Sequence, residues 1–483
     1  MPSRRTKIVA TLGPSSSSPQ VLEQLILAGM NVARLNCSHG SPDEHKARAQ
    51  LVRELAAKHD RHVALLGDLQ GPKIRIAKFA NKRIELQEGD AFRFSISHPR
   101  DAGTQEVVGI DYPDLVKDCK VGDELLLDDG RVIMVVDQVT ATELICSVTV
   151  GGPLSDHKGI NRRGGGLTAP ALTDKDKADI KLAAEMDLDY LAVSFPRDAA
   201  DIKYARRLLR EAGGEAGLIA KIERAETVND LQVLDAIIEA SDGVMVARGD
   251  LGVEIGDAEL VAVQKLIIER ARTLNRVVIT ATQMMESMIT QSMPTRAEVF
   301  DVANAVLYGT DAVMLSAETA AGAYPIETVE AMRRVIVGAE KHPQAHRSRH
   351  RMDDVFHKID ESIAMAAMYA ANHLHGVKAI ICMTESGDTP RLMSRIRSHL
   401  PIYAFSRNPR TQHRVALFRG VQTIPFDSDS FSVDEVNSRA VDELLRRGVV
   451  ADGDHVLISR GDYANAQGGT NCLRVIRVGD RIY

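Results

Sequence analysis

A carboxylate, a lysine and an arginine follow one another closely after a short apolar run of the chain. The run covers residues 63–67, and Asp68, Lys73 and Arg75 come after it, with Gly71-Pro72 bending the chain between them. Enzymes with parallel sheets gather charged side chains at the carboxyl ends of buried strands to bind anionic substrates. These residues therefore predict a site for an anion.

Two further motifs combine the same kinds of side chain. Lys221 and Glu223 are two positions apart, so on a strand they share one face. The carboxylates of Glu223 and Asp250 are hard oxygen ligands suited to Mg²⁺, and Gly249 lets a ligand approach the backbone closely. Together with Arg248, these groups are the equipment that stabilises a phosphoryl group in transfer. A ring of ion pairs that only stabilises the fold is the alternative.

These motifs lie at the ends of short apolar runs that alternate with helical segments. Segments 258–275 and 297–309, for example, carry apolar residues at helical spacing. Near-continuous apolar strands in repeated β-α units are typical of a closed parallel barrel, so we predict a (β/α)8 TIM barrel. The expected strands are residues 7–13, 31–38, 63–68, 190–194, 218–223, 243–247, 277–282 and 312–316. Polar residues at their carboxyl ends include Asn36, Ser38, Asp68, Ser194, Lys221, Glu223, Asp250, Thr282, Ser316 and Glu318.

Two regions break the barrel pattern. Residues 71–167 hold short alternating strands and turn signals, which indicate a small β-barrel lid domain inserted after the third strand. In residues 346–483 helices and strands alternate again, which indicates a C-terminal open α/β sheet that serves as a regulatory domain. The catalytic barrel then takes residues 1–70 and 168–345.

Composition excludes several classes of protein. The formal net charge is −6, and aromatic residues make up only 4% without tryptophan, so neither a basic field nor stacking platforms for nucleic acid are expected. No apolar run approaches the ~18 residues of a membrane span, and residues 7–10 are too short for a signal-peptide core. The five cysteines form no C-x-x-C pair, which favours a reducing compartment. We expect a cytoplasmic protein that binds neither nucleic acid nor membrane.

Longer motifs resemble one family. Residues 33–40 (ARLNCSHG), 245–254 (MVARGDLGVE) and 281–288 (ATQMMESM) are similar to motifs of the pyruvate kinases, and they stand in family order. Further matching motifs are residues 220–223, 294–298, 301–306 and 316–320, the last with alanine where the family commonly has glycine. The resemblance covers the whole chain and points to the bacterial, lysine-type K⁺-independent subgroup.

The resemblance implies transfer of a phosphoryl group from phosphoenolpyruvate to ADP, which gives pyruvate and ATP in glycolysis. Arg34 would hold the phosphoryl group and Lys221 would neutralise its charge in flight. Glu223 and Asp250 would bind Mg²⁺ or Mn²⁺. A Mg²⁺-dependent barrel lyase or aldolase acting on a pyruvate enolate is the competing enzyme, and a scaffold or nucleic-acid-binding protein is the non-enzymatic alternative.

Other positions carry over from the same family motifs. The backbone of Gly249 and the hydroxyl of Thr282 would contact the substrate carboxylate. Thr282, Ser316 and Glu318 would relay a proton to the enolate carbon through water. Positions expected to contact the nucleotide are Asn36, Arg75 and Lys158.

One departure from the family bears on the monovalent cation. Many pyruvate kinases hold K⁺ through oxygens at the positions of Asn36, Ser38, Asp68 and the Leu69 carbonyl. The position of Lys73 is usually glutamate there, and Leu69-Gln70 is usually threonine-lysine. An ammonium at Lys73 would supply the positive charge covalently and repel K⁺, so we expect no K⁺ requirement. The alternative is that Lys73 points to solvent and K⁺ still binds.

A loop in the C-terminal region predicts an effector site. Thr384, Ser386, Gly387 and Thr389 follow a predicted strand, and Thr389 is the expected N-cap of the next helix. In pyruvate kinases this loop, with a second loop here at residues 461–470, often binds a phosphorylated activator. Because acidic residues lie nearby, a sugar monophosphate or AMP is expected rather than a bisphosphate. A capped helix without a ligand is the alternative. The family also implies a homotetramer.

Overall fold

The computed structural model describes residues 4–346, 350–432, 435–461 and 469–480. Among them, eight parallel strands close into a barrel in the order β1-β16-β15-β14-β13-β12-β3-β2. Their bounds are Lys7–Leu12 (β1), Val32–Asn36 (β2), Ala64–Asp68 (β3), Tyr190–Val193 (β12), Gly217–Ile222 (β13), Gly243–Ala247 (β14), Val277–Ala281 (β15) and Ala312–Leu315 (β16). The prediction of a (β/α)8 barrel is confirmed, because each expected apolar run overlaps one of these strands.

Helices cover the outside of the barrel and bury their apolar faces against it. Many begin at a capping box: the side chains of Ser41, Thr173 and Thr295 each accept a hydrogen bond from the amide of the third helical residue, and the backbone amides of these three residues donate to that residue's carboxylate. The helices are α1 (Pro19–Ala28), α2 (Pro42–Lys58), α4 (Asp174–Glu185), α5 (Ala199–Glu211), α6 (Ala225–Asn229), α7 (Leu231–Ala240), α8 (Arg248–Ile255), α9 (Asp257–Thr273), α10 (Arg296–Tyr308), α11 (Ala317–Ala320) and α12 (Pro325–Ala339).

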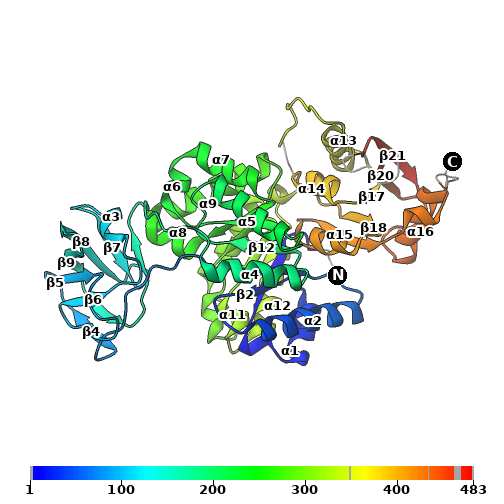
Figure 1. Cartoon of the computed structure of the whole chain (residues 1–483). Helices are drawn as coiled ribbons and strands as arrows, with labels where there is room; N and C mark the ends of the chain where they lie inside the picture. Colours follow the sequence, from blue (N-terminus) through cyan, green and yellow to red (C-terminus); the bar gives the residue numbers. More distant parts are fainter. Residues whose placement is uncertain (1–3, 347–349, 433–434, 462–468, 481–483) are drawn as a thin grey trace.

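The β-rich insertion between β3 and α4 has its own apolar core around Phe92 and Phe94. Its described strands form a six-stranded sheet, β11-β7-β8-β9-β5-β6, and a two-stranded sheet, β10-β4. The bounds are Arg83–Leu86 (β4), Ala91–Ser95 (β5), Val107–Gly109 (β6), Glu124–Leu127 (β7), Val132–Val139 (β8), Glu143–Val150 (β9), Gly152–Ser155 (β10) and Ile160–Arg162 (β11), with one short helix, α3 (Leu115–Asp118). This insertion lies at one end of the molecule, beyond the barrel (Figure 1).

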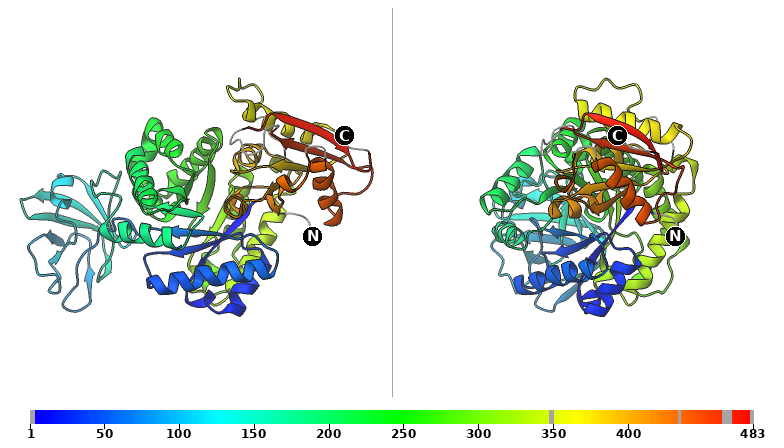
Figure 2. Two further views of the ribbon diagram at one scale, coloured as in Figure 1. Left: turned by 45° about the vertical axis from the view of Figure 1, so that its right-hand side comes forward. Right: turned by 90° about the vertical axis from the view of Figure 1, so that its right-hand side faces the viewer.

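The C-terminal region forms a sheet at the opposite end, as both Figure 1 and Figure 2 show. In its described part the strand order is β19-β18-β17-β20-β21, with β21 antiparallel to β20. The strands are β17 (Val377–Met383), β18 (Ile402–Ser406), β19 (Val421–Pro425), β20 (His455–Arg460) and β21 (Cys472–Arg477). The helices are α13 (Ile359–His373), α14 (Asp388–Ser394), α15 (Pro409–Arg414) and α16 (Glu435–Arg446).

The predicted start of α14 is wrong. Thr389 is not the N-cap, because the helix begins at Asp388 and is preceded by Gly387 with a φ of 87°. The Gly387 amide donates to the Thr384 hydroxyl at 2.9 Å, so the chain turns before Thr389 is reached. A left-handed backbone at this position suits glycine, which has no Cβ to clash. The Thr389 side chain is buried and shares a hydrogen bond with the Thr470 hydroxyl instead.

The C-terminal region packs against the amino-terminal end of the barrel. The buried side chains of Arg395, just after α14, and Asp311, just before β16, form an ion pair, with 2.8 Å between Nη1 and Oδ2. Lys7 at the start of β1 donates to the Val421 carbonyl at 2.5 Å. Apolar residues inside the barrel and in the C-terminal region belong to one continuous buried cluster. In the described residues, no helix is both long and apolar enough to cross a bilayer.

Candidate active site

Asp68 stands at the centre of the predicted site and holds two cations. Its Oδ2 lies 2.6 Å from Arg34 Nε, and its Oδ1 lies 3.3 Å from Lys221 Nζ. Burial alone would raise the pKa of Asp68, but the charges of Arg34 and Lys221 outweigh it and lower that pKa. Arg34 also donates to the Thr11 hydroxyl at 2.9 Å. Asp68 is therefore a buried carboxylate that fixes the positions of two positive groups.

Lys221 is surrounded by oxygen atoms. Its Nζ lies 2.9 Å from Glu223 Oε1 and donates to the Ser194 hydroxyl at 2.8 Å. Burial would lower the pKa of the Lys221 ammonium, but the charges of Asp68 and Glu223 raise it above its ordinary value. Ser194 in turn donates to the Leu69 carbonyl at 2.7 Å. The ammonium is thus held charged in one place.

Glu223 and Asp250 are the carboxylates that fit a divalent cation. Glu223 Oε2 accepts a hydrogen bond from the Phe195 amide at 2.8 Å, whereas its Oε1 is close to Lys221 without hydrogen-bond geometry. Burial raises the pKa of Glu223 to about 7, and the negative charge of Asp250 adds to the rise. A 2+ ion would relieve that repulsion. In the described residues no group of three potential ligands occurs, so these two acids would share the ion with substrate and water oxygens.

Thr282 has a backbone conformation that branched residues rarely adopt. Its φ is 68° and that of Gln283 is 55°, so two consecutive residues are left-handed directly after β15. The Thr282 hydroxyl donates to the Ala281 carbonyl at 2.7 Å and accepts from the Gly249 amide at 2.9 Å. The predicted carboxylate contacts, Gly249 and Thr282, are therefore joined to each other.

Arg248 maintains this turn. Its guanidinium donates to the carbonyls of Ala281 at 3.1 Å and Thr282 at 2.5 Å, and it pairs with Asp301 at 2.6 Å. From its sequence motif, Arg248 was expected to act with the other charged residues on a phosphoryl group. Its hydrogen bonds identify it instead as a positioning residue for Thr282.

Glu318 and Ser316 form a separate pair on the neighbouring strand end. The Glu318 carboxylate accepts hydrogen bonds from the amides of Ser316 at 2.6 Å and Met285 at 3.2 Å. Burial raises the pKa of Glu318. No direct hydrogen bond joins the side chains of Thr282, Ser316 and Glu318 in the described part of the chain. A proton passing between them would therefore need water.

A cavity of about 240 Å³ separates the insertion from the barrel. Lys73, Arg75, Lys158 and Asp250 are among its lining residues. Arg75 Nη1 donates to the His157 carbonyl at 2.7 Å, and Lys158 Nζ lies 2.7 Å from Asp128 Oδ1. The structure therefore brings the basic groups of the lid to the cavity that contains Asp250. Asn36 does not line it.

The residues at the expected monovalent-cation positions lie together without Lys73. Asn36 is opposite Asp68 across β2 and β3, and Asn36 Oδ1 accepts from the Ser38 amide at 3.1 Å. The exposed Lys73 faces the cavity, and no hydrogen bond or ion pair of its side chain occurs within the described residues. Among the described residues, the Lys73 ammonium therefore has no hydrogen bond or ion pair with Asn36, Ser38 or Asp68.

The predicted effector residues divide into two groups. The Ser386 hydroxyl donates to Asp388 Oδ2 at 2.8 Å, and Thr384 supports the turn at Gly387 as described above. Thr389 faces the other way, toward Thr470. Residues 462–468 of the second predicted loop lie outside the described residues.

Sequence reasoning missed the roles of Ser194 and Asp301. Ser194 was noted only as a polar strand end, and Asp301 only as part of a motif. A hydroxyl after an apolar strand was the available signal for Ser194. For Asp301 there was none, because the residue lies 53 positions from the Arg248 that it pairs with.

Comparisons with known proteins agree on one family. Residues 3–329 match a family model described as pyruvate kinase, barrel domain, and residues 361–476 match one described as pyruvate kinase, alpha/beta domain. The chain is 59% identical over 475 residues to pyruvate kinase II of Salmonella typhimurium, covering 98% of this chain and 99% of that protein. It is 56% identical over 476 residues to a pyruvate kinase of Haemophilus influenzae, with the same two coverages. Identity to a pyruvate kinase of Mycobacterium tuberculosis is 40% over 486 residues, or 99% of each chain.

Proposed function

The chain belongs to the pyruvate kinase family, and from that premise we propose which residues carry out the reaction. The protein transfers the phosphoryl group of phosphoenolpyruvate to ADP, giving pyruvate and ATP. The bond between phosphorus and the enol oxygen breaks, and a new bond forms to a β-phosphate oxygen of ADP. The enolate left behind takes up a proton at its methylene carbon. A lyase or aldolase activity is not favoured.

Lys221 and Arg34 handle the charge of the phosphoryl group. The observation that carries this assignment is their common attachment to Asp68, with distances of 3.3 and 2.6 Å. Two cations fixed in a buried site stabilise a moving anion without reorganising during the reaction. Arg34 binds the phosphoryl group in the substrate, and Lys221 neutralises it during transfer.

Glu223 and Asp250 hold Mg²⁺ or Mn²⁺. The family generally needs Mg²⁺ and K⁺. The divalent ion, when bound, neutralises oxygens of the substrate. The carboxylate of phosphoenolpyruvate lies against the Gly249 backbone and the Thr282 hydroxyl. Support comes from the charge repulsion between the two acids and from the Gly249–Thr282 hydrogen bond.

The nucleotide binds in the cavity under the insertion. Arg75 and Lys158 contact its phosphates and Asn36 completes the contact, the two basic residues being supported by their place on the cavity wall. Closing of the insertion over the cavity excludes water that would otherwise accept the phosphoryl group. Thr282, Ser316 and Glu318 then deliver the proton to the enolate through water.

Further proposals concern the whole enzyme. The catalytic barrel takes residues 1–70 and 168–345, the lid 71–167 and the regulatory domain 346–483, divisions that agree with the separate sheets.

Lys73 removes the need for K⁺. A sugar monophosphate or AMP activates the enzyme through the loop of Thr384, Ser386, Gly387 and Thr389. The enzyme acts in the cytoplasm as a homotetramer, as its metabolic substrates and family suggest.

Lys221→Met tests the central assignment. Removing the cation aimed at the phosphoryl group should lower kcat by roughly 10²–10³-fold, because the charge that develops during transfer loses the group assigned to neutralise it. ATP formation from phosphoenolpyruvate, ADP and Mg²⁺ measures the effect, with thermal unfolding to show that the variant folds. Lys46→Met is the matched control, since Lys46 is exposed and pairs with Glu185 on the surface. A folded Lys221→Met enzyme with near-normal turnover would refute the assignment.

A further inference from the structure

A second cavity, of about 220 Å³, lies between the barrel and the C-terminal sheet. Its barrel side consists of Tyr190, Asp242 and Arg276, and its other side includes Ser386, Gly387, Asp388, Arg391, Arg414 and Phe418. It is smaller than the ~300–1,000 Å³ of drug-sized pockets, so it suits a small ligand. Among the described residues it collects three arginines, none of which the sequence analysis connected with a site.

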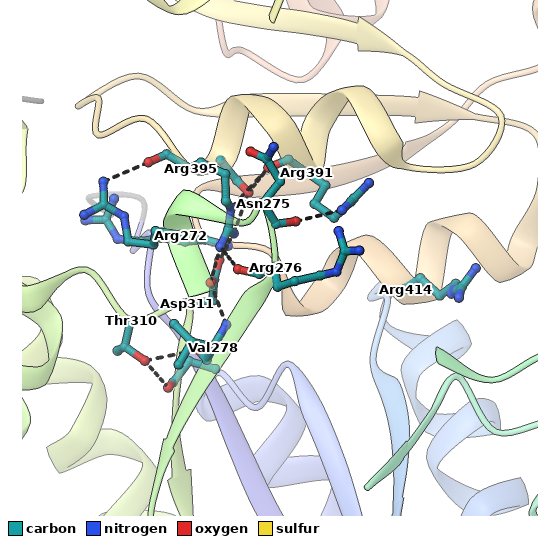
Figure 3. A network of polar contacts seen from close by, with 12 residues as sticks. Arg272, Asn275, Arg276, Val278, Thr310, Asp311, Arg391, Arg395 and Arg414 are labelled. Carbon is teal, nitrogen blue, oxygen red and sulfur yellow. Dashed lines mark hydrogen bonds and ion pairs between the residues drawn. The ribbon is translucent and has the colours of Figure 1, made fainter. Parts of the chain in front are cut away.

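Arg276 and Arg391 bring two guanidinium groups near each other. Within the described residues, the Arg276 side chain donates to backbone carbonyls alone, those of Ser241 at 2.6 Å, Glu239 at 2.9 Å and Leu274 at 3.4 Å. Burial lowers the pKa of Arg276, and the positive charge of Arg391 lowers it further. Figure 3 shows these side chains close together, one from each side of the junction. Like charges held this way are stabilised by an anion.

Arg414 is the third positive group. Its backbone carbonyl accepts a hydrogen bond from the Tyr190 hydroxyl at 2.7 Å, which fixes the end of α15 against the barrel. No hydrogen bond or ion pair holds its guanidinium in the part of the chain that the structure describes, although the group is half-buried. Gly217 makes room for it, because a Cβ there would lie 3.2 Å from Arg414 Nη2.

The two acids of the cavity are already engaged by other groups. Asp242 pairs with Arg206 at 2.9 Å and accepts from the Leu218 amide at 2.7 Å. Asp388 pairs with Arg391 at 2.8 Å and accepts from Ser386. Among the described residues, no carboxylate lies within hydrogen-bonding distance of the Arg276 or Arg414 guanidinium, although Asp242 and Glu239 act on Arg276 from farther away. Three arginines and two aspartates line the cavity, and Arg206 neutralises Asp242, so the excess charge is positive and suits a phosphate monoester, which carries nearly two negative charges at neutral pH.

We propose that this cavity binds the phosphate of a small phosphate monoester between Arg276 and Arg414. The paired N–H groups of an arginine guanidinium suit phosphate oxygens, and the Ser386 hydroxyl adds a further donor. The inference rests on the proposed activation by a phosphorylated metabolite. It deepens that proposal by placing the phosphate against the barrel, on the side of the loop away from Thr389 and Thr470.

The position of the cavity links the ligand to the active site. Tyr190, Asp242 and Arg276 stand at the amino ends of β12, β14 and β15. The carboxyl ends of these strands lead to Ser194, Asp250 and Thr282.

Arg391 on α14 and Arg395 just after it also donate hydrogen bonds to the same barrel segment. Arg391 donates to the Asn275 carbonyl at 2.7 Å and Arg395 to the Arg276 carbonyl at 2.6 Å (Figure 3). A ligand that tightens this junction would therefore act on the segment six residues before Thr282.

Calorimetric titration of the full-length protein tests the inference without relying on catalysis. The probes are glucose 6-phosphate, AMP and inorganic phosphate, in a buffer free of other oxyanions. We expect saturable binding of a monoester, and the tighter of the first two probes identifies whether a sugar or a nucleoside carries the phosphate. Arg414→Gln should weaken binding by about tenfold or more, because it removes a bidentate cation. The bound monoester should lower the KM for phosphoenolpyruvate in the unmutated enzyme only.

Two variants serve as controls. Arg410→Gln changes the same residue type on the same helix, outside the cavity, where Arg410 pairs with Asp187 and Glu215, and it should leave binding unchanged. Thr389→Ala removes the hydroxyl that faces Thr470, so it should affect binding only if the phosphate lies in the loop instead. If Arg414→Gln does not fold, Arg414→Lys keeps the charge but loses the fork, and weaker binding is again expected. Absence of saturable binding, equal affinity in the Arg414 variant, or equal loss in the Arg410 variant would overturn the inference.

Discussion

Thr282 combines an unfavourable backbone with a well-placed hydroxyl. A left-handed conformation in a branched residue costs on the order of 1–3 kcal/mol and persists where surrounding contacts enforce it. Here Arg248 enforces it by donating hydrogen bonds to the carbonyls of Ala281 and Thr282. The result is a hydroxyl held at the Gly249 amide.

Thr282→Val tests the effect of the hydroxyl separately from the packing of the side chain. Valine has the same shape but cannot accept from the Gly249 amide or pass on a proton, so we expect kcat to fall by roughly 10²-fold. Thr282→Ser keeps the hydroxyl and should retain most of the activity. Steady-state kinetics of the two variants gives the comparison. Similar kcat values for serine and valine would show that the hydroxyl takes no part in the reaction.

The positive charge of Lys73 bears on whether the enzyme needs K⁺. The ammonium is exposed at the cavity and is not joined to Asn36, Ser38 or Asp68. A flexible lysine can still add positive charge near the transferred group once the cavity is filled, and that charge would disfavour K⁺.

The corresponding prediction compares salts at matched ionic strength. Activity with Mg²⁺ should be nearly equal in K⁺, Na⁺ or a bulky quaternary ammonium salt, because Lys73 carries the charge that K⁺ would bring. Lys73→Glu, combined with Leu69→Thr and Gln70→Lys, should create dependence on K⁺. Stimulation of the unmutated enzyme by K⁺ of about tenfold or more over the bulky cation would contradict the prediction.

Individual residues differ in how far their roles could be predicted. Lys221 and Glu223 share a motif of three residues, so their proximity at 2.9 Å follows from local geometry. The pairing of Arg248 with Asp301 and of Ser194 with Lys221 depends on how segments far apart in the sequence meet, which no local pattern encodes.

At the scale of elements, α8 connects the segment that carries Asp250 to the insertion. Glu254 on this helix accepts hydrogen bonds from the Ala225 amide at 2.8 Å and from Asn161 of β11 at 3.5 Å. The Gly164 amide of the lid linker donates to the Glu254 carbonyl at 3.0 Å. This carboxylate therefore lies at the hinge between barrel and insertion.

Glu254 should make the stability of the hinge depend on pH. Burial raises its pKa from 4.5 to about 7, and the nearby Glu226 contributes to the rise. A raised folded pKa means that the favourable contribution is complete below the unfolded value of 4.5 and is lost as pH rises through about 7.

Glu254→Gln removes this titration. Glutamine can still accept from Ala225 and can donate to a flipped Asn161 amide, so the variant should lose less stability than the parent between about pH 5.5 and pH 8. The difference should be on the order of 1–3 kcal/mol in urea unfolding. Glu330→Gln, at an exposed position of α12, is the control. Equal pH dependence in parent and Glu254→Gln would show that Glu254 ionises normally.

The elements themselves were largely predictable, because buried parallel strands read as apolar runs of four to six residues. The start of α14 was not. Its position depends on the left-handed Gly387 and on a hydrogen bond to Thr384, whereas Thr389 has an equally good capping side chain in the sequence. The composition of Thr384–Thr389 allowed both starts, and tertiary contact with Thr470 selected one.

At the scale of the whole molecule, the barrel and the C-terminal sheet share a charged junction. The Asp311 carboxylate accepts hydrogen bonds from Nη1 and Nη2 of Arg395, from the Val278 amide at 2.9 Å and from the Arg419 amide at 3.0 Å. It is 1% exposed, so its charge is withdrawn from water and depends on these partners. The sheet and the amino ends of the barrel strands are therefore expected to unfold as one cooperative unit.

Asp311→Asn tests this cooperativity. Loss of one charge leaves Arg395 buried without its carboxylate, and breaking a buried pair in this way costs about 3–5 kcal/mol. We expect that loss in urea unfolding, together with separation of one transition into two as the sheet detaches before the barrel melts. Asp235→Asn breaks a partly exposed pair with Arg270 that joins helices α7 and α9 of the barrel region. It should cost only about 1 kcal/mol or less, with a single transition. If both variants lose the same stability and keep one transition, the cohesion of the two regions comes from their shared apolar cluster rather than from Asp311.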